Sequence, residues 1–307
     1  MDRLVSMSVF VTAVEEGSIA AAARRLSLSA VMAGRYLSAL EEALSVRLLE
    51  RSTHQLNLTD AGASYFAKAK RILNDIREAE QEATAKHISP QGSLRIAAPV
   101  TFGTLYLAPL IAAFMRDYPQ VDIQLQLLDR FIDLVDEGVD LAIRIGQLPD
   151  SDLVARRIID YRLLACATPR YLAGAGMPVL PEDLYHHVLI GYSGTMTTSP
   201  WRFSAASGEV SQIVPSCRVL ANNTGIMVEL ALQHAGIVYG PEFVVQPHLQ
   251  TGDLVEVLPD YRCPVISLFA VTLNAKYVNT KTRLFIGYLQ QALAPHKSSD
   301  TPPALNR

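Results

Sequence analysis

The sequence has few cysteines, almost no net charge and no long apolar run. Its 307 residues include only three cysteines, Cys166, Cys217 and Cys263, which lie far apart without a Cys-x-x-Cys spacing. This odd, scattered set argues against a disulfide-stabilised secreted fold, so we expect reduced thiols in a cytoplasmic protein. The longest mostly apolar stretch, residues 105–115, is too short to cross a bilayer, and no signal-peptide run follows the first residues. We therefore expect no membrane partner.

The charge balance excludes a protein that is basic throughout. Lys and Arg number 27 and Asp and Glu number 30, giving a net charge of -3, while 50% of the residues are hydrophobic. This length and composition suit about two domains with sizeable cores. Residues 1–60 carry six basic and seven acidic side chains. Any nucleic-acid surface must therefore be local.

Residues 1–60 contain no proline and have the pattern of a helix-turn-helix. Apolar residues recur at helical spacing from Leu4 to Val14, and Ser18 suits the N-cap of a short helix over 19–26. Ser29 suits the N-cap of a third helix over 30–44, which places the helix-turn-helix at about 19–38. Two short apolar runs, 46–51 and 56–59, flank a polar turn and predict a wing.

Residues 61–90 predict a linker helix with a heptad seam. The seam consists of Tyr65, Ala69, Ile72, Ile76, Ala79 and Ala83, spaced alternately four and three residues apart. It suits pairing with a second copy of the chain, because helix-turn-helix proteins usually bind two half-sites as dimers. The alternative is a helix that packs on its own domain.

From Ser89-Pro90-Gln91-Gly92 onward, short β-branched runs alternate with helical patterns, which predicts an α/β region with largely parallel sheets. A helix is expected over 132–137. About 200 residues of this kind suit two small lobes. We expect lobe I over 91–165 plus 268–297 and lobe II over 166–267. Residues 298–307 would form a disordered tail.

Several segments together resemble the LysR-type transcriptional regulators. The N-terminal resemblance is carried by Gly17-Ser18-Ile19, Ala22-Ala23-Arg24-Arg25-Leu26, Leu40-Glu41-Glu42-Ala43-Leu44, Arg47-Leu48-Leu49-Glu50-Arg51 and Leu58-Thr59-Asp60-Ala61-Gly62. In the second half it is carried by Ala98-Pro99, Pro119-Gln120-Val121, Asp133-Leu134-Val135 and Asp140-Leu141-Ala142-Ile143-Arg144-Ile145-Gly146. The resemblance implies a winged helix-turn-helix, a dimerising linker helix and a two-lobed domain like a periplasmic binding protein. It also implies transcriptional control by a small effector in a homodimer or homotetramer.

A recognition helix reads bases with the residues of its first turns. Arg35 is the one side chain there that can bind guanine through two hydrogen bonds. Gly34 allows a close approach of the helix to DNA, or is simply a tolerated surface glycine. The candidate DNA-binding residues are Ser18, Ser29, Ala30, Val31, Gly34, Arg35, Ser38, Arg51, Thr53 and His54.

Ligands of open α/β sheets bind beyond the carboxyl ends of strands, near helix N-termini. Two strand-to-helix junctions fit, one after Pro99 and one after Ala221, and the resemblance also implies effector contacts at the first. The candidate effector-binding residues are Thr101, Phe102, Gly103, Asp129, Arg144, Gly146, Tyr192, Trp201, Asn222, Asn223 and Thr224. For Thr101 and Asn223 the alternative is helix capping, for Arg144 a structural ion pair, and for Trp201 the core of a lobe.

An enzyme is the main competing class, and the motifs argue against it. Gly191-Tyr192-Ser193-Gly194 is not a nucleophile elbow, His186-His187 lacks the spacing of a zinc site, and no glycine-rich phosphate loop occurs. We expect no metal and no cofactor other than a non-covalent effector, for which a carboxylate is one candidate. The expected partners are promoter DNA, a second copy of the chain and, as a further candidate, RNA polymerase, in the cytoplasm at the nucleoid.

Overall fold

The computed structural model describes residues 2–51, 56–84, 90–149, 151–194, 200–273 and 278–294. Thr53 and His54 lie outside these ranges. The contacts divide the chain into two units, Met1–Ser89 and Pro90–Arg307. Among the described residues no single helix is long and apolar enough to span a membrane, and α1 and α2 meet that test only as a pair bent by 120°.

The N-terminal unit is a winged helix-turn-helix followed by a long helix. Its elements are α1 (Arg3–Glu15), α2 (Ile19–Arg25), α3 (Ala30–Leu44), β1 (Leu49–Arg51), β2 (Leu56–Leu58) and α4 (Asp60–Thr84). The predicted caps are present, since Ser18 Oγ accepts from the Ala21 N–H at 3.2 Å and Ser29 Oγ from the Met32 N–H at 3.2 Å. Strands β1 and β2 pair antiparallel, so the predicted wing is confirmed.

Helix α4 packs on the core of its own unit. Ala69 is fully buried in the cluster around Phe10, Leu37 and Leu40, and the Tyr65 ring lies 5.7 Å from the Phe10 ring. Ala69 therefore packs within its own unit, as in the alternative of a helix that packs on its own domain, and Tyr65 is half-buried there. Pairing of two copies through the seam stays a prediction.

The next two residues of the predicted seam are less buried than Ala69. Ile72 is 42% exposed and Ile76 is half-buried, so both remain available to a partner. Nothing is described of the side chains of Ala79 and Ala83.

The second unit is an α/β region. Its elements are β3 (Gly92–Ala98), α5 (Val100–Phe102), η1 (Gly103–Leu107), α6 (Ala108–Asp117), β4 (Val121–Leu127), β5 (Leu141–Ile145), β6 (Val154–Ala167), α7 (Pro169–Ala175), η2 (Pro181–His186), β7 (Leu189–Tyr192), β8 (Trp201–Ser204), β9 (Val210–Ile213), β10 (Cys217–Ala221), α8 (Thr224–Leu232), β11 (Ile237–Pro241), α9 (Glu242–Thr251), β12 (Val255–Glu256), β13 (Val265–Thr272) and α10 (Thr280–Leu293). The predicted helix over 132–137 is absent. Those residues form turns, in which the Asp133 carboxylate accepts from the N–H groups of Val135 and Asp136.

One mixed sheet runs through this unit in the order β10-β7-β11-β6-β13-β5-β3-β4. The long strand β6 pairs with β13 along Val154–Arg162 and with β11 from Leu163 to Cys166. We call the part with β3, β4, β5 and β13 lobe I and the part with β7, β10 and β11 lobe II. The partner switch falls at Leu163, slightly before the predicted boundary at residue 165. Strand β3 pairs parallel with β4 and β5, and β7 pairs parallel with β10 and β11. All pairs that include β6 or β13 are antiparallel, so the expectation of largely parallel sheets is only partly right.

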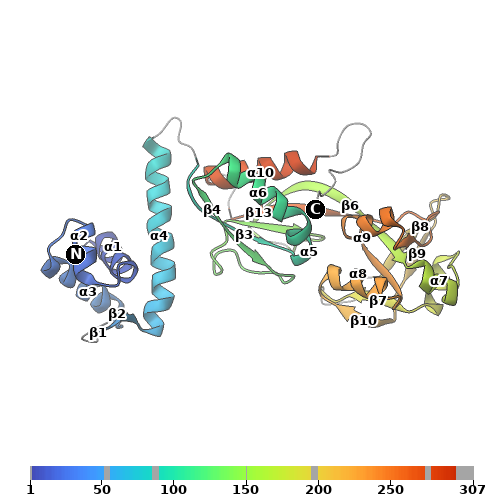
Figure 1. Ribbon diagram of the computed structural model, residues 1–307, viewed down its shortest axis with the longest axis horizontal. Helices are drawn as coiled ribbons and strands as arrows, with labels where there is room; N and C mark the ends of the chain where they lie inside the picture. Colours follow the sequence, from blue (N-terminus) through green and yellow to red (C-terminus); the bar gives the residue numbers. More distant parts are fainter. Residues whose placement is uncertain are drawn as a thin grey trace. The chain divides into compact units, whose positions relative to one another are not determined.

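Two faces of the lobe I sheet are covered differently. Helices α6 and α10 lie side by side on one face (Figure 1). Between them the rings of Phe114 and Phe285 meet edge to face at 5.1 Å. The other face carries a smaller apolar cluster with Ala97, Ala142 and Val271, covered by the irregular segment after β4. Because β3, β4 and β5 are parallel, their carboxyl ends meet at one edge.

Candidate DNA-binding and effector-binding sites

The first two turns of α3 present an open face. Ala30, Arg35 and Ser38 are exposed, and Val31 is 68% exposed although it is apolar. Arg35 makes no hydrogen bond or ion pair with any residue that the structure describes. An exposed Val and a free guanidinium on a capped helix suit contacts with a thymine methyl group and a guanine edge. Ser29, also exposed, uses its hydroxyl oxygen for the cap.

Gly34 lies on the same helix with free space beside it. A Cβ built on Gly34 meets nothing within 4 Å, so packing within the unit does not require a glycine. Tyr36 instead packs with Val9, Ala23 and Ala33 and belongs to the domain core. Of Gly34 and Tyr36, only Gly34 is therefore free of packing within the unit and able to affect a DNA contact.

Glu41 and Gly62 hold the wing against the helices. The Glu41 carboxylate in α3 accepts from the N–H groups of Leu48 and Leu49 at 2.8 and 3.2 Å. Gly62 in α4 lies so close to the chain that a Cβ there would be 1.9 Å from the Leu48 carbonyl oxygen. The candidate Arg51 lies in β1, and nothing is described of its side chain.

Helix α2 supplies weaker candidates. The Ser18 oxygen accepts the capping bond, while its hydroxyl hydrogen remains able to donate to a phosphate. Arg25 forms an ion pair with Glu16, and Arg24 is exposed. Arg25 is therefore already engaged within the unit.

Four of the residues around the strand ends form a hydrogen-bonded connection between the lobes, which we call the inter-lobe bridge: Thr101, Asp129, Asn223 and Gly225. Asn223 Nδ2 donates to Asp129 Oδ2 at 2.7 Å, and the Gly225 N–H donates to Thr101 Oγ1 at 3.0 Å. Asn223 also caps α8, because its Oδ1 accepts from the Ile226 N–H at 3.0 Å. Capping and bridging are therefore combined in one side chain.

The other bridge contacts fix the carboxylate. Asp129 Oδ1 accepts from the Val100 N–H at 3.1 Å, so each oxygen of the carboxylate has a donor. Tyr192 lies close enough for the Asp129 charge to matter, since burial raises the pKa of Tyr192 and the Asp129 carboxylate raises it further. Sequence reasoning missed two backbone donors: the N–H of Val100, the first amide after β3, and the N–H of Gly225, in the first turn of α8.

Three candidate effector residues lie inside the protein core instead. Phe102 is fully buried and stacks on Tyr106 with ring centroids 5.5 Å apart. A Cβ on Gly103 would be 2.2 Å from Leu127, so this glycine serves packing. Trp201 is 4% exposed and stacks on Tyr239 at 4.9 Å, which favours the alternative of a lobe core. Packing within a lobe is the observed role of these three residues, and effector contact stays a prediction for them.

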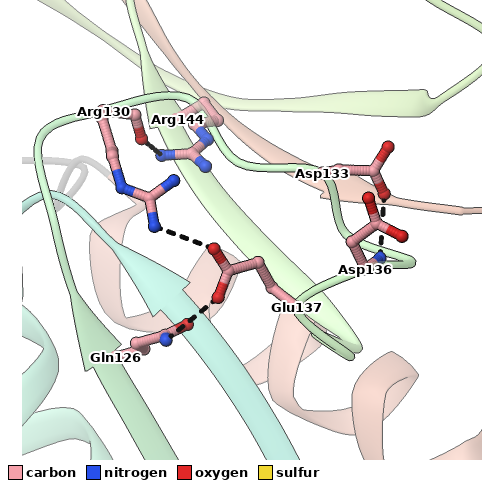
Figure 2. A network of polar contacts seen from close by, with 6 residues as sticks. All are labelled: Gln126, Arg130, Asp133, Asp136, Glu137 and Arg144. Carbon is pink, nitrogen blue, oxygen red and sulfur yellow. Dashed lines mark hydrogen bonds and ion pairs between the residues drawn. The ribbon is translucent and has the colours of Figure 1, made fainter.

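The remaining candidates lie around the bridge without joining it. Gly146 has φ +99° and donates its N–H to the Ser267 carbonyl at 3.0 Å. Asn222 is exposed, and Thr224 is the first residue of α8. Arg144 is 7% exposed, and its Nη1 donates to the Arg130 carbonyl at 3.1 Å (Figure 2). It forms no ion pair with a described carboxylate, so the alternative of a structural ion pair is wrong.

Two family models together match nearly the whole chain. Residues 4–63 match the model described as "Bacterial regulatory helix-turn-helix protein, lysR family", and residues 87–294 match "LysR substrate binding domain". The chain belongs to the LysR family. It is a DNA-binding transcriptional regulator with an effector-binding domain, not an enzyme. Within the described residues of this regulator, no group of three or more His, Cys, Asp or Glu is placed to hold a metal.

Named relatives of this LysR-type regulator are similar over almost their full length. The regulator PtxR of Pseudomonas aeruginosa is 36% identical, with 95% of this chain and 93% of PtxR covered. The solved structure of CrgA from Neisseria meningitidis is 35% identical, covers 94% of this chain and 98% of its own, and has a TM-score of 0.61. The full-length Vibrio cholerae virulence activator AphB is 27% identical with a TM-score of 0.58, covering 94% and 98% of the two chains.

Proposed function

We propose that this LysR-type regulator binds a pseudo-palindromic promoter site as a homodimer or a dimer of dimers, with Arg35 of each copy reading a guanine. The observation that carries this is the open face of α3, where Val31 and Arg35 are exposed and Arg35 has no partner among the described residues. Pairing through the exposed part of α4, from Ile72 onward, would present two such helices to two half-sites. The target being chromosomal, the site of action would be the nucleoid.

We further propose that the effector binds at the inter-lobe bridge and changes how the lobes are held. Asp129 already supplies a carboxylate that accepts from Asn223 and Val100. A ligand with hydrogen-bond donors, such as an ammonium or a polyol, suits this position better than the carboxylic acid that the sequence suggested. Such a ligand shifts the regulator only if it binds one lobe arrangement more tightly than the other. Altered DNA bending or contact with RNA polymerase would be the output.

The test is a DNA-binding titration by fluorescence anisotropy on the region upstream of the regulator's own gene, at several salt concentrations. Arg35→Met should weaken binding to the native site by about 5- to 150-fold, the range of about 1–3 kcal/mol for a base contact. Arg24→Met is the matched control, because Arg24 is an exposed arginine at the end of α2. It should lower affinity for native and scrambled DNA alike, if at all.

Equal loss in the two variants, or no loss in Arg35→Met, would contradict the role of Arg35. Equal weak binding of the wild type to native and scrambled DNA would contradict a site in that region. Repeating the titration with candidate ligands tests the effector proposal. If a ligand changes the affinity of the protein for DNA by some factor, DNA must change the affinity of the protein for that ligand by the same factor.

A further inference from the structure

Arg144 is a buried cation on the less covered face of lobe I. It lies on β5 two residues after Ala142, so both side chains project from the same face of the sheet. Ala142 belongs to the apolar cluster with Ala97, Ile132 and Leu134. Arg144 itself is 7% exposed, so its guanidinium is largely removed from water among apolar neighbours.

The guanidinium uses few of its donors. Nη1 donates to the Arg130 carbonyl at 3.1 Å, whereas Nη2 is buried and has no hydrogen-bond partner among the described residues. A guanidinium offers five N–H donors, so a fork suited to a carboxylate is left over. The Phe131 ring covers it, with the guanidinium carbon 5.5 Å from the ring centroid.

None of the acidic side chains drawn beside Arg144 is hydrogen-bonded to it (Figure 2). Glu137 accepts from Arg130 at 2.8 Å and from Gln126 at 3.4 Å. Asp133 accepts from two backbone N–H groups of its own turn. Arg130 and Glu137 neutralise each other, whereas Arg144 forms no ion pair with a described carboxylate.

Burying a charge without a counter-charge is unfavourable. Burial lowers the pKa of Arg144, and the nearby Arg130 lowers it further. An arginine nevertheless stays protonated in proteins. A bound anion would remove this cost, and the apolar surroundings would favour one that carries an apolar group.

We propose that Arg144 binds the carboxylate of a small apolar monocarboxylic acid beneath Phe131, at a site in lobe I that is distinct from the inter-lobe bridge. A carboxylate would supply the ion-pair partner that the buried Arg144 lacks, and its planar shape matches the free fork of the guanidinium. Ile132, Leu134 and Val271 would surround the apolar part of the acid.

Phe131 is the movable cover of this site. Its side chain is 53% exposed, and it lies between β4 and β5 in a segment without helix or strand. Displacing the ring uncovers the guanidinium without disturbing a strand. The adjacent Asp129 belongs to the inter-lobe bridge, so an acid held by Arg144 lies next to the effector site that we propose. Binding of the acid can be tested without DNA.

The experiment is fluorine NMR of 4-fluorobenzoate with the full-length protein, in which binding broadens the ligand signal. The neutral 4-fluorobenzamide is the ligand control. Arg144→Met should weaken binding of 4-fluorobenzoate by at least about tenfold, the loss expected for charge-assisted hydrogen bonds. Arg95→Met is the matched protein control, because Arg95 lies on the neighbouring strand β3 and donates to Gln124 at 3.1 Å. Thr101→Val, which alters the inter-lobe bridge, should leave binding unchanged.

The proposal is overturned if the wild type does not broaden the signal, if the benzamide binds equally, or if Arg144→Met and Arg95→Met lose binding alike. Loss in Thr101→Val alone would place the acid at the bridge and would also overturn it. Without ligand, Arg144→Met should melt no lower than the wild type, because it removes an unpaired buried charge. If it melts much lower or does not fold, Arg144→Lys decides, since lysine keeps the charge but lacks the fork and should still weaken binding.

Discussion

Replacing Asn223 with Asp tests the inter-lobe bridge without removing the helix cap. Asp and Asn are about equally good N-caps, so the bond from the Ile226 N–H would survive. The new carboxylate would face Asp129, whose Oδ2 now lies 2.7 Å from the Asn223 amide nitrogen. An attractive contact between the lobes would become a repulsive one.

The magnitude follows from this geometry. Losing a hydrogen bond to a charged group costs about 1.5–3 kcal/mol, and two unit charges 4 Å apart repel by about 4 kcal/mol near a protein surface. Solvent and protonation of one acid relieve part of this. We expect Asn223→Asp to lower the free energy of unfolding by about 2 kcal/mol at pH 7, which corresponds to a melting temperature lower by about 4–8 °C.

The pH dependence has a definite sign. Two facing carboxylates raise the pKa of one of them in the folded state above its unfolded value, so the folded variant binds a proton more readily. The destabilisation should therefore be present at pH 7 and should shrink as the pH falls through that raised pKa. Thermal melts followed by circular dichroism at several pH values measure it.

The double variant Asp129→Asn, Asn223→Asp is the decisive control. It exchanges the two groups, so an amide can again donate to a carboxylate across the lobes. We expect it to recover most of the loss of Asn223→Asp, which gives a coupling energy of at least about 1 kcal/mol. A single variant as stable as the wild type, or a double variant that recovers nothing, would refute the bridge as a stabilising contact.

Gly34→Ala should stabilise the N-terminal unit by about 1 kcal/mol, because Ala is a better helix former and has space here. Hydrogen exchange of the α3 amides should then slow about fivefold. If the helix backbone approaches DNA closely, the same change should weaken DNA binding. As the contrasting change, Gly62→Ala should destabilise the unit by about 1–3 kcal/mol, because the new Cβ would clash with the Leu48 carbonyl. Equal effects of Gly34→Ala and Gly62→Ala on stability would contradict both expectations. Ser267→Ala should raise the pKa of Asp160 in an NMR titration, since the Ser267 hydroxyl is the main cause of its depression. A carboxyl group whose pKa is lower in the folded state stabilises the fold above its unfolded pKa, and this stabilisation is lost as the pH falls through the folded pKa. The variant has less of this stabilisation, so it should lose less stability on acidification than the wild type.

Local signals in the sequence predicted the parts of the fold that depend on local chemistry. Ser18 and Ser29 were predicted as N-caps, and capping was the alternative given for Asn223; each accepts the expected backbone hydrogen bond. A cap needs only a few consecutive residues, so its physics is contained in the sequence. The same is true of the strand-to-helix junctions, which led to Thr101 and Asn223.

Local patterns did not predict what covers a side chain. Phe102 and Trp201 are candidate effector-binding residues, and packing buries both. The segment 132–137 has helical spacing but is short, and the Asp133 carboxylate satisfies the backbone as a turn instead. These outcomes depend on distant residues such as Tyr106 and Tyr239, which no local pattern contains.

The position of Ala69 bears on how two copies would pair. Because Ala69 lies in the core cluster with residues of α1 and α3, the exposed part of the predicted seam begins only at Ile72. Such a short stretch buries little apolar area, and stable interfaces usually need about 1,200 Å² or more in total. Residues 1–60 carry six basic and seven acidic side chains, so we expect their affinity for DNA to depend on pairing. We therefore expect surfaces of the second unit to supply much of the dimer interface, and residues 1–89 alone to bind DNA far more weakly than the whole chain.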